Sequence, residues 1–173
     1  GAWNGLYRGT PARVTPAGLQ GAPIGAIAAL RAPDGKTETL FAGGRSGIWR
    51  GDGAQWTPVR GAWQTVIRAL LPTRDGRLWI GTASGLYLQT LDGRGAPATR
   101  YCRPTRVLSS NVTALTRLPK GDVAVASTGG IDFYRGAARI RSLSGTDGMP
   151  CHQTRGVAED ADVVAIDEAQ FFD

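Results

Sequence analysis

Three pairs of polar or aromatic residues lie just ahead of short apolar segments: Trp63-Gln64, Ser110-Asn111 and His152-Gln153. Their indole, amide, hydroxyl and imidazole groups form the hydrogen bonds by which proteins hold polar ligands. Arg68 and Arg155 occupy matching places in two of the segments, where a guanidinium would attract an anion. We therefore predict a ligand-binding site at these residues, the alternative being ordinary solvated loops.

The patterns that would support catalysis are missing from the sequence. Cys151 and His152 are adjacent, so in an extended chain their side chains point to opposite sides. Ser109 and Ser110 have no Gly-x-Ser-x-Gly setting, and no complete phosphate-binding loop is present. We predict that the chain is not an enzyme, with no catalytic residue and no cofactor.

The two cysteines, Cys102 and Cys151, match no zinc or redox spacing, and no metal site is predicted. They could form one disulfide in an oxidising compartment or remain two separate thiols.

Glycine and proline punctuate the whole chain, with 25 Gly and 10 Pro among 173 residues. This density excludes a helical bundle, because glycine and proline destabilise helices. A hydrophobic content of 42% is too high for a disordered chain. Short apolar runs between turn residues indicate an all-β protein.

The net charge of +6 comes mostly from single, scattered arginines. The last 18 residues, 156–173, hold six acidic residues and no basic one. No basic run concentrates the field as a nucleic-acid interface would, so no nucleic-acid partner is predicted. The chain has no signal peptide and no apolar run long enough to predict a membrane segment.

The apolar segments recur along the chain. Residues 66–87 align with 24–49 and with 112–131 at offsets of 38 and 45 residues, and partial copies begin at Gly5 and near Gly156. Periods of this length, each with three or four short strands, are typical of β-propeller blades. We predict a β-propeller fragment of about four blades, each a short antiparallel sheet.

Each repeat suggests how its blade is built. Turns are predicted at Asp34-Gly35, Asp75-Gly76 and Lys120-Gly121, where glycine can adopt a positive φ. Bulky residues should wedge between blades, and small ones should allow close backbone approach. The wedge residues are Phe41, Trp49, Trp79 and Tyr87, and the glycines are Gly43, Gly81 and Gly85.

The stretch Leu78-Trp79-Ile80-Gly81-Thr82, followed by Gly85-Leu86-Tyr87, resembles the repeat of two-component regulator propellers. The resemblance implies a periplasmic sensor placed ahead of a membrane helix and a histidine kinase or diguanylate cyclase. It also implies that a glycan or another small anionic ligand binds without catalysis. The partners would be the remaining blades and the downstream signalling domains of the parent protein.

We expect a partial propeller over residues 1–162 and an atypical acidic tail over 163–173. The expected blades are 1–20 (partial), 24–60, 64–105, 110–145 and 152–162 (partial). The predicted function is ligand sensing or binding, and the alternative is a structural or protein-interaction platform.

The tail contains Asp167-Glu168-Ala169-Gln170-Phe171-Phe172, which resembles a segment of thymidine kinases. In that family the Asp assists magnesium binding and the Glu is the catalytic base. This chain lacks the phosphate-binding loop and the zinc cysteines of that family, so we expect no kinase activity.

Overall fold

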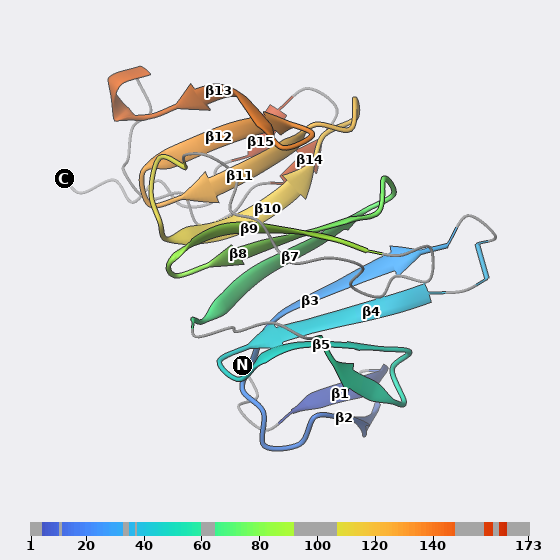
Figure 1. Cartoon of the computed structure of the whole chain (residues 1–173). Coiled ribbons are helices and arrows are strands. Elements are labelled where there is room, and N and C mark those ends of the chain that lie inside the picture. The colour runs from blue at the N-terminus through green and yellow to red at the C-terminus, as the bar shows by residue number, and fades with distance from the viewer. Residues whose placement is uncertain are drawn as a thin grey trace.

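The computed structural model consists of short antiparallel sheets that follow one another along the chain (Figure 1). It describes residues 5–10, 12–32, 35–36, 38–59, 65–91 and 107–147, with the backbone of 158–160 and 163–165. Among these residues the single helical element is one 3-10 turn, Gly145–Asp147. The predicted all-β class is confirmed.

Three sheets contain three or four consecutive strands each, and we number them as blades 1 to 3. Blade 1 contains β3 (Ile24–Arg31), β4 (Glu38–Gly44), β5 (Gly47–Gly51) and β6 (Trp56–Pro58). Blade 2 contains β7 (Ile67–Thr73), β8 (Arg77–Thr82) and β9 (Gly85–Thr90). Blade 3 contains β10 (Val112–Arg117), β11 (Val123–Ser127), β12 (Gly130–Arg135) and β13 (Ala138–Leu143).

Two-stranded sheets flank the three blades. One pairs β1 (Leu6–Thr10) with β2 (Arg13–Gly18), and the other pairs β14 (Ala158–Asp160) with β15 (Val163–Ala165). β14 lies within the expected partial propeller, and β15 begins at Val163, the first residue of the expected tail.

The first strand of each blade is the inner one. β3 contacts β7, β7 contacts β10, and β10 contacts β14. Figure 1 shows the sheets stacked in chain order, from β1–β2 to β10–β13. This is the arrangement of neighbouring β-propeller blades, so the predicted fold is confirmed.

Successive side chains of β8 point to opposite faces of blade 2, and both faces are buried. Leu78 and Ile80 belong to the core cluster shared with blade 1, whereas Trp79 belongs to the cluster shared with blade 3. Of the predicted wedge residues, Phe41 and Trp79 are buried, and Trp49 and Tyr87 are half-buried. The hydrophobic core therefore lies between blades rather than inside any one of them.

Two glycines allow the blades to approach. A Cβ at Gly43 would lie 2.5 Å from Ile67 Cγ2, and a Cβ at Gly81 would lie 2.6 Å from Val112 Cγ1. Ile67 and Val112 are the first residues of β7 and β10, so the same contact recurs at both blade interfaces. Gly85 has a φ of 141° at the start of β9, in the β8–β9 hairpin.

The predicted turns form as expected where they are described. Gly76 has a φ of 77° and donates its N–H to Thr73 O at 3.1 Å. Gly35 and Gly121 also have positive φ and close turns of the same kind, to Ala32 O and Leu118 O. Among the described helices, none is long and apolar enough to cross a membrane.

Candidate functional site

A β-bulge opens the inner strand of every full blade. The pairing register shifts between Ile24 and Ala26, between Ile67 and Ala69, and between Val112 and Ala114. The residues at the three bulges are Gly25, Arg68 and Thr113. Bulges redirect a side chain and are frequent beside functional sites.

Arg68 is the charged member of this set. Its side chain is exposed, and within the described residues no carboxylate lies at ion-pair distance from it. Arg77, Arg135 and Arg139, by contrast, pair with Asp75, Asp122 and Asp132. Arg68 thus differs from these three arginines in having no described ion pair.

The loop that leads into β10, residues 107–111, contains the predicted site residues of blade 3, Ser110 and Asn111. We call it the lead-in loop. Ser109 Oγ and Thr128 Oγ1 are hydrogen-bonded at 2.6 Å, and Thr128 N–H donates to Asn111 O at 3.1 Å. The lead-in loop and the β11–β12 turn therefore lie at one end of blade 3, where β10 begins.

The same backbone contact occurs in blade 2. Ala83 N–H, in the β8–β9 turn, donates to Val66 O at 3.1 Å, just before β7. Arg68 and Thr113 follow these contacts on neighbouring inner strands. We call this end of the blades, with Arg68, Thr113 and the lead-in loop, the candidate ligand face.

The predicted site residues divide into two groups. Ser110 is exposed and Asn111 is half-buried, and both lie on the lead-in loop. The amide oxygen of Asn111 is itself buried and accepts no hydrogen bond from the described residues. The other predicted residues, Trp63, Gln64, His152, Gln153 and Arg155, lie outside the described part of the chain.

Hydroxyl groups shape the hairpin turns at this end of the blades. Thr82 Oγ1 donates to Gly85 O at 2.7 Å and accepts the N–H of Ser84 at 3.1 Å. In blade 3, Ser127 Oγ does the same with Gly130 O and Gly129 N–H, at 3.2 and 3.3 Å. Hydrogen bonds inside each turn therefore stabilise the two turns that border the candidate ligand face.

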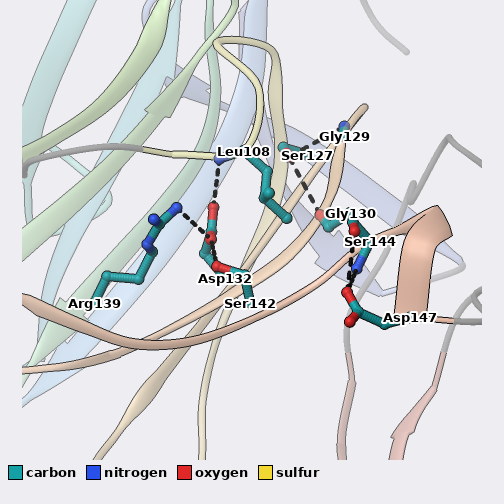
Figure 2. Close-up of polar contacts among 9 residues, drawn as sticks. All are labelled: Leu108, Ser127, Gly129, Gly130, Asp132, Arg139, Ser142, Ser144 and Asp147. Atoms are coloured by element: carbon teal, nitrogen blue, oxygen red, sulfur yellow. Dashed lines mark hydrogen bonds and ion pairs between the residues drawn. The ribbon is translucent and has the colours of Figure 1, made fainter.

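One buried carboxylate near this face is absent from the predicted set. Asp132 on β12 is fully buried, and its oxygens accept hydrogen bonds from the lead-in loop and from β13 (Figure 2). Its sequence signal is slight: at an offset of 45 residues it aligns with Tyr87, an acid where the repeat has an aromatic residue.

Tyr134 lies two residues along β12 and is also fully buried. Burial, together with the negative charge of Asp132, raises the pKa of Tyr134 to about 12. Its phenol therefore stays neutral throughout the physiological pH range.

The described groups on this face include the exposed guanidinium of Arg68, the exposed Ser110 and the amide oxygen of Asn111. Groups of these kinds form ionic and hydrogen bonds. Among the described residues no group of three or more His, Cys, Asp or Glu side chains could hold a metal ion.

Comparison with known families identifies one repeat. Residues 62–84 match the family model described as "Two component regulator propeller". No curated protein matches the sequence.

Solved structures extend the similarity to most of the chain. The extracellular domain of BT4673 from B. thetaiotaomicron, described as a hybrid two-component system, gives a TM-score of 0.65 at 16% identity, over 91% of this chain and 23% of that one. The WD40 propeller of Doa1 gives 0.60 at 13%, over 80% and 45%.

A protein assigned as a gluconolactonase gives a TM-score of 0.52 at 16% identity, over 76% of this chain and 51% of that one. The chain thus spans about a quarter to a half of the length of these structures. At such identities the similarity establishes the fold. The chain is therefore a set of β-propeller blades, and residues 62–84 of it match the model of the two-component regulator propeller.

Proposed function

We propose that the chain is part of a ligand-sensing β-propeller in a two-component-type receptor, acting in the periplasm and without catalysis. The observation that carries the proposal is Arg68: a bulge exposes it at the end of an inner strand, and no described carboxylate neutralises it. The hydroxyl-rich lead-in loop of the adjacent blade adds hydrogen-bonding groups.

The ligand class follows from this chemistry. A guanidinium binds carboxylate or sulfate, whereas hydroxyl and amide groups bind the hydroxyls of a sugar. An acidic oligosaccharide would satisfy both. The match of residues 62–84 to two-component regulator propellers and the likeness to the BT4673 extracellular domain support a sensory role.

Signal transfer would depend on partners beyond this segment. Bound ligand would favour one packing of neighbouring blades, and the remaining blades and downstream signalling domains of the parent protein would respond. Clusters of buried hydrophobic side chains pack between the blades, so a change at one end can shift a whole blade.

A thermal-shift screen tests the proposal. Trigalacturonate represents acidic oligosaccharides, and cellotriose is the neutral control of similar size. Trigalacturonate at about 100 times its Kd should raise the Tm by about 5–10 °C, because it binds the folded state alone. If no acidic or neutral oligosaccharide raises the Tm, the sensor proposal fails and a structural platform is favoured.

A further inference from the structure

Asp132 occupies a position that the other blades give to an aromatic residue. In the hairpin between the second and third strands, Asp132 pairs with Val125, Tyr87 with Ile80, and Trp49 with Ala42. These are equivalent places in blades 3, 2 and 1. Tyr87 and Trp49 are half-buried, whereas Asp132 is 0% exposed.

Both oxygens of this carboxylate are used. Oδ2 accepts the backbone N–H of Leu108 at 2.7 Å, and Oδ1 accepts Ser142 Oγ–H at 2.6 Å and Arg139 Nη1–H at 3.2 Å. Figure 2 shows Leu108, Arg139 and Ser142 around the carboxylate of Asp132, each approaching from a different side. One carboxylate therefore joins the lead-in loop to the outer strand of blade 3.

Such a buried charge persists in a folded protein when hydrogen bonds and an opposite charge compensate its lost hydration. Arg139 supplies the opposite charge, and Ser142 and Leu108 supply the remaining donors. The N–H of Leu108 has a fixed direction, so its bond to Asp132 also fixes the backbone of the loop.

Two glycines beneath Leu108 show how closely the loop is seated. A Cβ at Gly129 would lie 3.1 Å from the carbonyl carbon and oxygen of Leu108, and a Cβ at Gly130 would lie 3.1 Å from Leu108 Cδ1. Ser109 and Thr128 add a hydrogen bond one residue further along the loop. The loop is thus fitted against the β11–β12 hairpin as well as tied to Asp132.

We propose that Asp132 is a positioning residue of the candidate ligand face: its buried carboxylate holds the lead-in loop in one conformation and so sets where Ser110 and Asn111 lie. Its role toward a ligand rests on the function proposed above. At the equivalent place blades 1 and 2 have the indole of Trp49 and the phenol of Tyr87 in place of a carboxylate.

Amide hydrogen exchange, followed by NMR in the 173-residue chain without ligand, tests this role. Asp132→Ala removes the acceptor of the Leu108 N–H. Exchange at Leu108 should then accelerate by about 10- to 100-fold relative to the amides of β8, as expected on losing a hydrogen bond to a charged group. A purely structural role would accelerate exchange in both places equally.

Two further variants keep the test decisive. Asp132→Asn preserves size but offers one carbonyl oxygen to three donors, so it should also accelerate exchange at Leu108, and it serves if the alanine variant does not fold. Asp122→Asn removes the Asp122–Arg135 pair in the same blade and should leave exchange at Leu108 unchanged.

The inference would be overturned if, in both Asp132 variants, the exchange rate of the Leu108 amide rose no more than the rates of the β8 amides. Failure of the proposed function has a different signature. The wild-type chain would then bind neither trigalacturonate nor cellotriose, and the exchange result would still decide the role of Asp132.

Discussion

The indole ring of Trp79 and the phenol ring of Tyr134 meet edge to face, with centroids 5.4 Å apart and planes at 62°. Trp79 belongs to β8 of blade 2 and Tyr134 to β12 of blade 3, so the contact joins two blades. Edge-to-face pairs add to the energy of apolar burial. This pair anchors the interface beside the carboxylate that holds the lead-in loop.

Tyr134 should make the fold sensitive to alkaline pH. Its pKa is raised to about 12 in the folded protein, against about 10 for an unfolded tyrosine. The folded state therefore holds the phenol proton more tightly, and the stability present below pH 10 should fall by about 2–3 kcal/mol as the pH rises to 12. Urea unfolding at pH 8 to 12 measures this loss.

Tyr134→Phe removes the ionisable group, so its stability should decline less steeply over the same pH range. Contributions from arginines and lysines are common to both proteins and cancel in the comparison. Parallel stability curves for the wild type and the variant would show that Tyr134 is not the responsible group.

The close approach of Gly81 to Val112 should be a strict packing requirement. Gly81→Ala places a methyl group 2.6 Å from Val112 Cγ1 and should destabilise the fold by about 1–3 kcal/mol. Val112→Ala removes the opposing methyl groups and lowers stability by leaving a cavity. In the double variant the two losses of stability should not add, because the methyl group added at residue 81 fills space that Val112→Ala leaves.

Chemical denaturation of the wild type, both single variants and the double variant gives the coupling energy directly. An additive double variant would mean that the two residues do not meet across the interface.

The hydroxyl of Thr82 should stabilise its hairpin. Thr82→Val keeps the shape but leaves the buried Gly85 O without its donor, which should cost about 1–3 kcal/mol. Thr90, at the exposed end of β9, provides the control: Thr90→Val should change stability by less than about 0.5 kcal/mol. Equal effects of the two substitutions in urea unfolding would rule out the turn hydroxyl as the cause.

The sequence predicted well what depends on neighbours along the chain. Leu78-Trp79-Ile80 alternates toward two buried faces, and Asp75-Gly76 closes a turn, because both depend on local backbone geometry. The matching of Arg68 with Thr113 also follows from the repeat, and the shared bulge gives it a structural basis.

Asp132 could not be predicted in the same way. Its partner Leu108 is 24 residues away in the sequence, and their contact depends on how the lead-in loop crosses the folded blade. In the sequence, Asp132 is only an acidic residue at a repeat position where the other two blades have Trp49 and Tyr87.

The central claim is that an acidic ligand binds at the end of the blades where Arg68 and the lead-in loop lie. An NMR titration of the ¹⁵N-labelled chain with trigalacturonate tests it most directly. Arg68→Ala is the test variant. Arg74→Ala removes an exposed arginine at the β7–β8 turn, the opposite end of β7, and is the matched control.

The account predicts amide shift changes centred on Arg68, Ser110 and Thr113. Arg68→Ala should weaken binding by about tenfold or more, as expected for loss of a charge-assisted hydrogen bond, and Arg74→Ala should bind like the wild type. Shift changes confined to other parts of the blades, or equal affinities for the two variants, would contradict it.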